Sequence, residues 1–528
     1  MTLLTKIATN YFICAWVCMV VSSIFAISGL FMDSVYYPKW ITTEVVVVFF
    51  VIFSVPFFLK KSISWRLVYK QICRFTNFIV FLEALFAIIQ YTDLYTVNMG
   101  YSVGTFNNLA GLVACISISF PMGLVFLDEY GKVERILFYI SKCADFFVLV
   151  LYGSRIGCVC MLFVFSLIFF RNIRYGKQIA TIIGCLAFAF SACILKTQST
   201  HGRLFIMERT VELIMKRPFF GCGSGGFTKE YMIEQAEYFV MHPDSKYVML
   251  ADNIHHPLNE FLLIATNFGV LGLLIVLVFC SVVFVYYRFH KTPYGREGCL
   301  ILLMIILIAL FSYPLSYPFT WLMLIISVVL IFSHVIKHIK NRTAFITLAL
   351  GLWLSCFFMI TPLRNELFFQ LSWKNASESS QLEHFENMNQ KYNALYQSGN
   401  YDYRFLYDYA CEAFDKEQFG LALKLAKETE SHVSDYELTL LIGDCYQSLD
   451  SLEDAIHCYE QAHYMCPSRL LPLYEMYNIY SGCNDTTNCW RLYAEISRKK
   501  IKVKNQVTDM ILKDINQDHC CPKKNSQT

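Results

Sequence analysis

Residues 258–287 read LNEFLLIATNFGVLGLLIVLVFCSVVFVYY, and Glu260 is the one charged side chain in this run. An α-helix needs about 20 predominantly apolar residues to cross the hydrocarbon core of a membrane. The run is long enough, and its apolar residues leave no polar face for water. It therefore predicts a membrane-spanning helix.

Similar apolar runs fill most of the chain before residue 362, and the composition agrees with them. The chain has 528 residues, of which 56% are apolar and 16% charged. Soluble domains carry about 25% charged residues, so a single water-soluble globule is excluded. The net charge of +3 argues against a nucleic-acid binder that relies on a basic surface. Besides 258–287, the predicted spans are 10–32, 41–59, 71–90, 104–126, 136–152, 156–170, 179–195, 298–313, 318–336 and 344–361.

These spans predict an all-α, polytopic membrane helix bundle of about eleven helices over residues 1–362. The first segment is too long for a usual secretion signal, so we expect a retained anchor. Alternate connections between the spans are rich in Lys and Arg, and the others are nearly bare. Basic connections lie on the cytoplasmic side, which puts the N-terminus in the cytoplasm and the loop 196–257 and the tail outside. The basic connections contain Lys60, Lys61, Arg66, Lys70, Lys132, Arg135, Arg171, Arg174, Lys177, Arg288, Lys291, Arg296, Lys337, Lys340 and Arg342.

The tail reads as ordinary soluble protein with an internal period. From Tyr436, a 34-residue helix–turn–helix template fits the sequence, because small residues fall where two helices cross and aromatic residues fall between them. This segment resembles a tetratricopeptide repeat. We predict a linker over 363–390, about three repeats over 391–500, and a polar, disordered end over 501–528; a generic domain of helical hairpins is the alternative. The template positions are Gly443, Tyr446, Ala455, Tyr459, Ala462 and Pro467.

Arg155 opens the sixth predicted span on the outer side, where the connections otherwise lack basic residues. An arginine next to hydrocarbon costs about 2–3 kcal/mol on insertion scales unless a partner compensates for it. It either extends to lipid headgroups or holds the phosphate of a lipid-linked substrate.

The outer loop concentrates further arginines in THGRLFIMERTVELIMKRPFFGCGSGGF, residues 200–227. Apolar residues at helical spacing predict a helix over 204–217, which Arg203 precedes and on which Arg209 lies. A guanidinium group grips phosphate oxygens in bidentate fashion, so Arg203 is the main candidate for phosphate binding. The glycines that follow form either a plain turn or a phosphate-wrapping loop. The expected apolar positions are Leu204, Met207, Val211 and Met215.

The same loop ends in ADNIHHPLNE, residues 251–260, with two adjacent histidines at the entry to an apolar helix. Imidazole titrates near neutral pH and can take a proton from a hydroxyl nucleophile. We therefore predict His256 or His255 as a general base, with Asn259 in support.

Two groups could suggest a metal, and we predict none in either. His255, His256 and Glu260 offer suitable ligands, but adjacent histidines do not easily face one ion. The His-Cys-Cys segment 519–521 has no second set of ligands nearby.

Polar residues within the other spans have simpler interpretations. Asn107 and Asn108 stand where the fourth span begins; capping that helix is their plain role, and supporting the site is their functional one. Lys142 and Asp145 are three residues apart and can neutralise each other, so we interpret them as structural.

The order of these features resembles the family of bacterial O-antigen ligases, O-antigen polymerases and protein O-oligosaccharyltransferases. In the family's segments, Arg155 matches an S-R-G arginine, Arg203 a G-R arginine, and Met207 stands at a tryptophan position. The spacing around the asparagines is shortened. Leu258 occupies the usual histidine position, so unwinding of the helix end would have to bring His256 or His255 there. The four pieces are FNNLAGLVACISISFP (106–121), GSRIG (153–157), GRLFIMERTVELIMKRPFFGCGSGGF (202–227) and NEFLLIATNFGVLGLL (259–274).

The resemblance implies a metal-independent glycosyltransferase without a cofactor in the bacterial inner membrane. It would transfer a glycan from an undecaprenyl-pyrophosphate carrier to an acceptor hydroxyl at the outer, periplasmic face. Arg155 and Arg203 would hold the diphosphate, with Arg209 assisting, and a histidine would activate the acceptor. The partners implied are the lipid-linked glycan, a lipid or protein acceptor, and a protein bound by the tail; a nucleic acid is not expected.

Alternatives remain at two levels. Ligase, polymerase and protein O-oligosaccharyltransferase differ in the acceptor, which the motifs do not separate. From another class, a lipid-glycan transporter would be expected to show matched halves and broken helices at mid-membrane, and the sequence shows no such pair.

Overall fold

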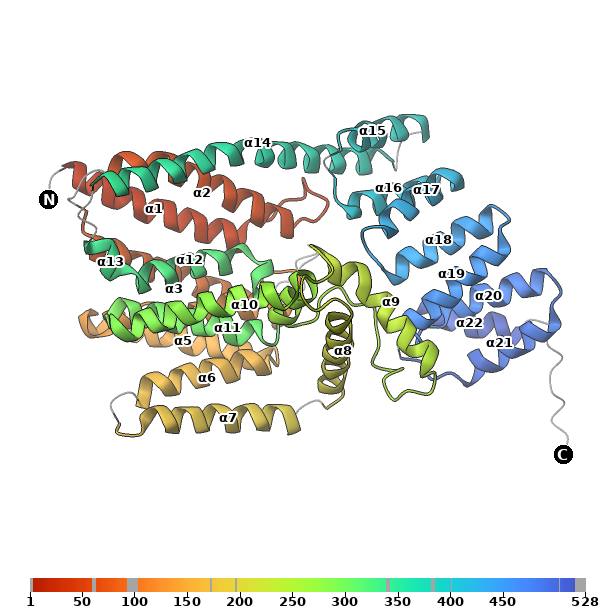
Figure 1. The fold of residues 1–528 in the computed structure, drawn as a ribbon, viewed down its shortest axis with the longest axis horizontal. Helices are drawn as coiled ribbons and strands as arrows, with labels where there is room; N and C mark the ends of the chain where they lie inside the picture. Colours follow the sequence, from red (N-terminus) through yellow and green to blue (C-terminus); the bar gives the residue numbers. More distant parts are fainter. Residues whose placement is uncertain are drawn as a thin grey trace. The chain divides into compact units, whose positions relative to one another are not determined.

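The computed structural model describes residues 3–58, 63–92, 103–170, 173–194, 197–338, 342–380, 385–399, 401–502 and 504–517, and these form an all-α fold, as predicted (Figure 1). Lys60, Lys61, Arg171, Lys340 and the segment 519–521 lie outside the described residues. The chain divides into two compact units. Unit 1 comprises Met1–Leu195, Leu258–Glu260 and Ile275–Asn375, and unit 2 comprises Lys196–Pro257, Phe261–Leu274 and Ala376–Thr528.

Unit 1 contains the helices of the apolar part of the chain, and its described residues form helices, turns and one isolated bridge, between Val103 and Phe106. α10 (Glu260–Phe289) and α14 (Arg342–Ser380) each continue into unit 2. The predicted linker 363–390 is therefore largely helical, because α14 runs through it to Ser380. The other helices are α1 (Leu3–Phe25), α2 (Tyr36–Phe58), α3 (Trp65–Tyr91), α4 (Leu109–Ser119), η1 (Leu124–Glu129), α5 (Lys132–Leu151), α6 (Arg155–Phe169), α7 (Gly176–Ile194), α11 (Pro293–Ala309), η3 (Pro314–Ser316), α12 (Pro318–Ile331) and α13 (Ser333–His338).

The chain is a multi-pass membrane protein. Among the described residues, four helical stretches are long and apolar enough to cross a membrane: Lys6–Phe25, Tyr36–Ser54, Trp65–Tyr91 and Glu260–Phe289. Shorter apolar helices accompany them, and each predicted span overlaps at least one helix. The number of eleven spans and the orientation remain predictions.

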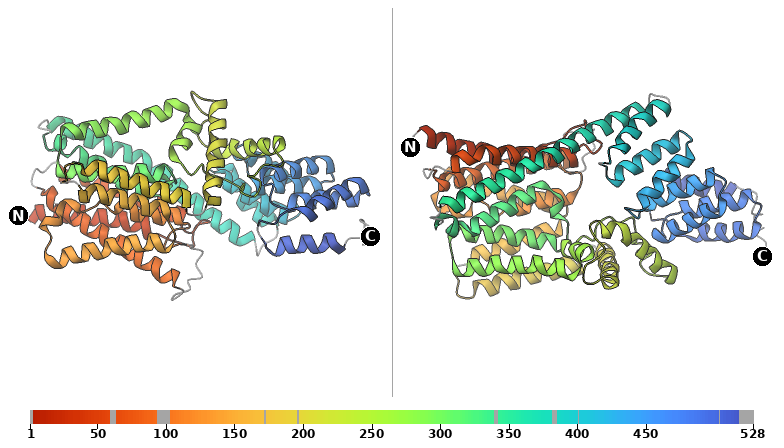
Figure 2. Two further views of the ribbon diagram at one scale, coloured as in Figure 1. Left: turned by 90° about the horizontal axis from the view of Figure 1, so that it is seen from below. Right: turned by 45° about the horizontal axis from the view of Figure 1, so that its top comes forward.

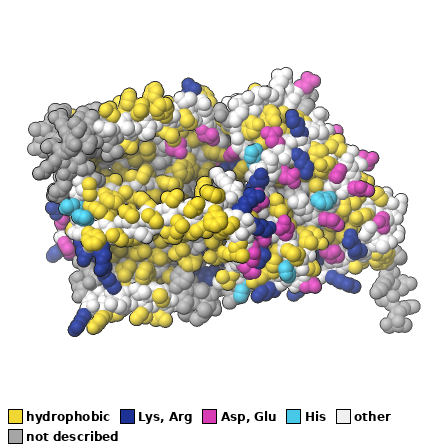
Figure 3. Space-filling model, in the orientation of Figure 1, with side chains coloured by type: hydrophobic (Ala, Val, Ile, Leu, Met, Phe, Trp, Pro, Cys, Tyr) yellow, Lys and Arg dark blue, Asp and Glu magenta, His cyan; other side chains and the backbone are white. Residues whose placement is uncertain are grey.

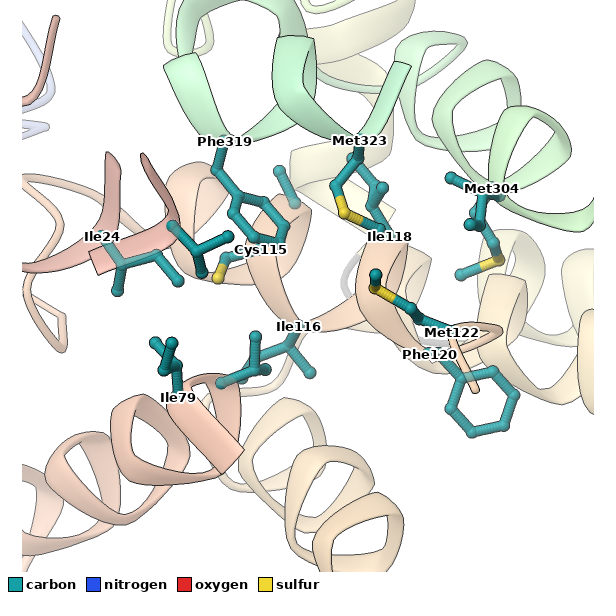
Figure 4. Close-up of a cluster of buried hydrophobic side chains, with 14 of the residues drawn as sticks. Ile24, Ile79, Cys115, Ile116, Ile118, Phe120, Met122, Met304, Phe319 and Met323 are labelled. Carbon is teal, nitrogen blue, oxygen red and sulfur yellow. The ribbon is translucent and has the colours of Figure 1, made fainter. Parts of the chain in front are cut away.

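The core of unit 1 is built around α4. Every residue of α4 from Gly111 to Ser119 is buried, which fits a helix that is apolar on all sides. Figure 4 shows side chains from α1, α3, α11 and α12 converging on it, among them Ile24, Ile79, Met304 and Phe319.

Glu297 on α11 is a buried carboxylate that the sequence analysis did not single out. It accepts hydrogen bonds from the backbone N–H groups of Gly123 (2.8 Å) and Val125 (2.7 Å) at the start of η1, and from the Tyr69 hydroxyl. Without Glu297, these three donors would be buried and would lack this hydrogen-bond acceptor, which costs free energy. Glu297 thereby ties α11 to α3 and to the turn before η1.

Ion pairs join the connections that were predicted to be cytoplasmic. Glu129 at the end of η1 lies 2.5 Å from Arg66 Nη2 and 3.4 Å from Lys70 Nζ, and Arg74 pairs with Glu134. These contacts bring the two connections together, as expected if both lie on the same side of the membrane. The predicted pairing of Lys142 with Asp145 is confirmed, with 3.3 Å between Nζ and Oδ2.

Unit 2 contains a series of helical hairpins. Consecutive helices pack in pairs as α16/α17, α18/α19 and α20/α21, and α17 and α19 contact the pair that follows each (Figure 2). The predicted disordered end differs from the structure, because α22 forms within it. The helices are α8 (Thr197–Lys216), α9 (Gly226–Met241), α15 (Phe385–Gln397), α16 (Tyr403–Asp415), α17 (Phe419–Glu430), α18 (Tyr436–Ser448), α19 (Leu452–Met465), α20 (Leu471–Gly482), α21 (Thr486–Arg498) and α22 (Gln506–Gln517).

The α18/α19 hairpin has the packing that the repeat template predicts. A Cβ on Gly443 would lie 2.7 Å from Tyr459 Cε1, so only glycine lets the two helices approach this closely. Ala455, Tyr459 and Ala462 are buried along the same interface. These contacts agree with a tetratricopeptide-like arrangement, whose family assignment remains a prediction.

The loop 196–257, predicted to lie outside, belongs to unit 2 together with the tail. α9 packs against α19, and the buried amide of Gln235 donates to the carbonyl oxygens of Met465 (2.7 Å) and Asp252 (3.0 Å). The sequence predicted the loop as part of the membrane domain. Its packing instead makes one compact body with helices that lie about 200 residues later in the chain.

Candidate functional site

The arginines of the outer loop lie on one helix, α8. The sequence placed Arg203 before the helix, but α8 begins at Thr197, so both Arg203 and Arg209 lie within it. Six residues of an α-helix turn the chain by about 600°, which leaves the two side chains about 120° apart around the axis. The two arginines therefore face different surroundings.

Arg209 faces α9 and lies among carboxylates of the protein itself. Its guanidinium lies 2.8 Å from Glu208 Oε1 and 3.7 Å from Glu234 Oε1, and 4.4 Å from the centre of the Tyr238 ring. Lys216 also pairs with Glu234. These contacts bind α8 to α9 and already neutralise the charge that was expected to assist a diphosphate.

The buried face of α8 does not coincide with the apolar positions whose spacing predicted the helix. Phe205 and Leu213 are buried, and Phe205 packs against Phe239 and Ala251. The predicted positions Leu204, Val211 and Met215 are exposed, and they form a separate apolar stripe. Figure 3 shows acidic and basic side chains gathered over α8 and α9, and mainly hydrophobic side chains over α10.

The glycine-rich segment 218–226 packs against a break in α10. At Gly269 the backbone leaves the helical conformation, with φ 70° and ψ −173°. The N–H groups of Cys222 and Gly223 donate to the carbonyl oxygens of Thr266 (2.8 Å) and Asn267 (2.9 Å), and Val270 N–H donates to Pro218 O (2.8 Å). The backbone donors of residues 222 and 223 are thus used within the protein, which favours the turn over the phosphate-wrapping loop.

The two histidines stand just before α10 in an irregular segment. Residues 251–259 form no helix, as the proposed unwinding of the helix end requires, and Leu258 has a positive φ of 55°. His255 is exposed, and His256 is half-buried. Burial lowers the pKa of His256 to about 4, so this imidazole is neutral at physiological pH and is a weak base.

A carboxylate of the tail faces the first of these histidines. Asp435 caps α18, and its Oδ2 lies 3.3 Å from His255 Nε2 and accepts a hydrogen bond from Asn253 Nδ2 at 2.8 Å. Sequence reasoning missed Asp435. Its place before a helix marks it as an N-cap, but nothing in the sequence pairs it with a histidine 180 positions earlier.

The predicted asparagines make structural hydrogen bonds within unit 1. Asn108 caps α4 by accepting from Gly111 N–H (3.2 Å), as expected, and it also accepts from the Tyr317 hydroxyl (2.7 Å). Its amide donates to Asn107 (3.2 Å), and Asn259 donates to Leu310 O (3.0 Å). These bonds fix the start of α4 and the end of α11.

Arg155 is the first residue of α6, after Ser154, whose hydroxyl caps the helix by accepting from Gly157 N–H (3.3 Å). Arg155 is half-buried and belongs to unit 1, whereas Arg203 and the histidines belong to unit 2.

Within unit 1, Lys39 is a basic residue that the sequence analysis did not select for the site. It is buried, donates to Ile24 O, and lies 4.8 Å from the centre of the Phe106 ring.

Residues 142–277 match a family described as O-Antigen ligase. This part of the chain is therefore similar to the O-antigen ligase family. No curated protein gives a significant match to the chain. The match includes Arg155, Arg203, Arg209 and both histidines, together with Asn259, whereas Asn107 and Asn108 precede it.

The matched segment begins within α5 and ends within α10, so it includes the loop helices α8 and α9. The tail hairpins lie outside the match, although they share a compact unit with the loop. Among the residues that the structure describes, no cluster of three or more His, Cys, Asp or Glu side chains is arranged to hold a metal ion.

Proposed function

We propose that this protein transfers a glycan from an undecaprenyl-pyrophosphate carrier to an acceptor hydroxyl at the outer face of the bacterial inner membrane. The observation that carries the proposal is the O-antigen ligase match, which contains all three candidate arginines and both candidate histidines in a multi-pass membrane protein. Lipid-linked glycans are the substrates that this family implies.

Arg155 and Arg203 are proposed to hold the diphosphate. The bond from the anomeric carbon to the phosphate oxygen breaks during transfer, and negative charge develops on the departing pyrophosphate. Fixed guanidinium groups stabilise that charge, which is the work that a metal ion does in other enzymes. Because Arg209 is engaged by Glu208 and Glu234, we assign it to holding α8 on α9 rather than to direct contact with substrate.

A histidine of the pair is proposed to activate the acceptor. One imidazole nitrogen takes the proton of the acceptor hydroxyl while the hydroxyl oxygen forms a bond to the anomeric carbon. The bond from that carbon to the phosphate oxygen breaks, and the carrier pyrophosphate leaves with its electron pair. A positioned base of this kind contributes about 10²–10⁴-fold to a rate.

The acceptor distinguishes the three activities within this class. A ligase glycosylates a lipid, a polymerase extends a glycan, and a protein O-oligosaccharyltransferase modifies a protein. Deletion of the gene should cause a lipid-linked glycan to accumulate, and the molecule that loses its glycan identifies the acceptor. We propose ligase-like transfer. If the deletion strain instead lacks glycan on a protein, the activity is that of a protein O-oligosaccharyltransferase, and if its glycan chains are no longer extended, the activity is that of a polymerase.

The test of the proposal is Arg203→Ala in the full-length protein, reconstituted with lipid-linked glycan and membranes from the deletion strain. Removing a group that stabilises developing charge costs about 10²–10³-fold in rate, so transfer should fall at least about 100-fold. Arg203→Lys keeps the charge without the bidentate geometry and should retain part of the activity.

Arg217→Ala is the matched control, because Arg217 follows α8, is exposed and pairs with Glu230 at 3.8 Å. It should transfer at the wild-type rate. Normal transfer by Arg203→Ala, with correct membrane insertion, would refute the assignment of the diphosphate site.

A further inference from the structure

The segment that carries the histidines is attached to the tail at several points. Asp252 lies 2.9 Å from Arg469 Nη2 and 3.1 Å from Lys502 Nζ. Next to it, Asn253 donates to Asp435 Oδ2 (2.8 Å) and accepts from the backbone N–H of Tyr436 (3.4 Å). The tail therefore fixes residues 252 and 253 immediately before the histidines.

Asp435 is itself held in a fixed orientation. Its Oδ1 accepts from the backbone N–H groups of Glu437 (2.8 Å) and Leu438 (3.1 Å) at the start of α18. Its side chain is 16% exposed, while that of His255 is 54% exposed. One oxygen is thus committed to the helix, and the other faces His255, more than half of whose side chain is exposed.

We propose that Asp435 is a positioning residue for His255, so that the helical tail completes the catalytic site of the outer loop. The inference rests on the proposed function and extends it to a residue outside the O-antigen ligase match. His255 Nε2–H would donate to Asp435 Oδ2, which leaves Nδ1 to take the proton of the acceptor hydroxyl. The carboxylate orients the ring and stabilises the imidazolium that forms, and it is not itself protonated.

The surroundings of the two histidines favour His255 for this role. His256 is half-buried, and its lowered pKa makes it a poor proton acceptor near neutral pH. His255 combines an exposed ring with a carboxylate partner held by a helix terminus. This assignment departs from the sequence analysis, which put His256 first.

The proposal is tested by a double-mutant cycle in full-length protein. Asp435→Asn retains helix capping, since Asn and Asp are about equal at N-caps, but removes the negative charge. We expect His255→Gln to lower kcat by about 100-fold and Asp435→Asn to lower it by about tenfold or more, each with little change in KM for the donor. Because Asp435 acts through His255, the double variant should be no slower than His255→Gln alone.

The donor probe is the lipid-linked glycan that accumulates in cells lacking the gene, and membranes of those cells supply the acceptor. Asp485→Asn is the matched control, because Asp485 caps α21 through Asn488 N–H (3.1 Å) in the same tail. It should transfer at the wild-type rate with unchanged thermal stability.

Each outcome decides between distinct alternatives. Multiplicative losses in the double variant, or wild-type kcat in Asp435→Asn or in His255→Gln, would overturn the positioning role. An equal loss in Asp485→Asn would assign the effect to tail stability and would also overturn it. If wild-type protein transfers no glycan, the proposed function itself fails, which is distinguishable from failure of the cycle alone.

Discussion

Glu297 in unit 1 and Asp252 in unit 2 are held in different ways. In unit 1, Glu297 and Asn259 are buried and bond to backbone groups of neighbouring helices. In unit 2, Asp252 is held by the side chains of Arg469 and Lys502, and all three are partly exposed. Buried hydrogen bonds to charged groups are costly to break, whereas exposed ion pairs contribute little and are screened by salt.

This difference indicates which part of the molecule is rigid and which can respond to conditions. The buried bonds of Glu297 are out of reach of solvent ions. The ion pairs of Asp252 with Arg469 and Lys502 are partly exposed, so salt screens this part of the attachment of the histidine segment. Three predictions examine this contrast.

The largest effect is expected at Glu297. Glu297→Ala leaves the N–H groups of Gly123 and Val125 and the Tyr69 hydroxyl without their acceptor, and each such loss costs about 1–3 kcal/mol. We expect a total loss of at least about 3 kcal/mol, measured as a lower melting temperature in detergent. Glu297→Gln keeps one acceptor and should lose less, and Glu134→Ala, at an exposed ion pair, should differ little from wild type. Equal melting temperatures for Glu297→Ala and Glu134→Ala would contradict the contrast.

A smaller effect is expected from acid at His463 on α19. Burial, with the nearby charge of Lys499, lowers its pKa to about 3. Below pH 6.5 the unfolded chain binds a proton that the folded chain does not, so folding stability falls as the pH decreases. Between pH 7 and 5 this loss is about 2 kcal/mol.

The test compares wild type with His463→Gln, which cannot take up this proton. Hydrogen exchange in α19, measured at pH 7 and pH 5 with correction for the intrinsic rate, should show a steeper loss of protection in wild type. Arg469 and Lys502 hold the pKa of Asp252 below its usual value despite its partial burial, so the loop ion pairs persist at pH 5. Identical pH dependence in the two proteins would show that His463 is not buried in its neutral form.

The smallest effect is expected from Arg469→Gln. Arg469 pairs with Asp252 (2.9 Å) and Glu437 (3.1 Å) at a partly exposed position, so its loss should cost about 1 kcal/mol or less. Hydrogen exchange over residues 251–255 should increase at low salt, and wild type should approach the variant at high salt. Lys427→Gln removes an exposed pair within α17 and should leave this segment unchanged. A variant whose exchange matches wild type at low salt would show that the ion pairs do not hold the loop.

The sequence predicted the fold well where the signal was local. Long apolar runs predicted the helices of unit 1, the spacing of Gly443 and Tyr459 predicted a close hairpin, and Lys142 and Asp145 pair as expected. The helix 204–217 was correct in type, but it starts earlier. It packs through Phe205 and Leu213 rather than through the apolar positions that predicted it, because apolar spacing alone does not distinguish a face that packs on protein from one that is exposed.

Contacts over long sequence separations could not be predicted. Asn253 bonds to Asp435, 182 residues later, and nothing in either segment specifies the other. Glu297 was likewise missed, because one acidic residue in an apolar helix does not reveal which backbone donors it will meet.

The break in α10 places two backbones in unusually close contact. A Cβ on Gly221 would lie 2.5 Å from Thr266 O, and one on Gly269 would collide with Phe219 O. A side chain at either position would push the two backbone segments apart and break the hydrogen bonds between them. The two glycines therefore depend on each other, since a side chain at either one would separate the glycine-rich segment from the break in α10.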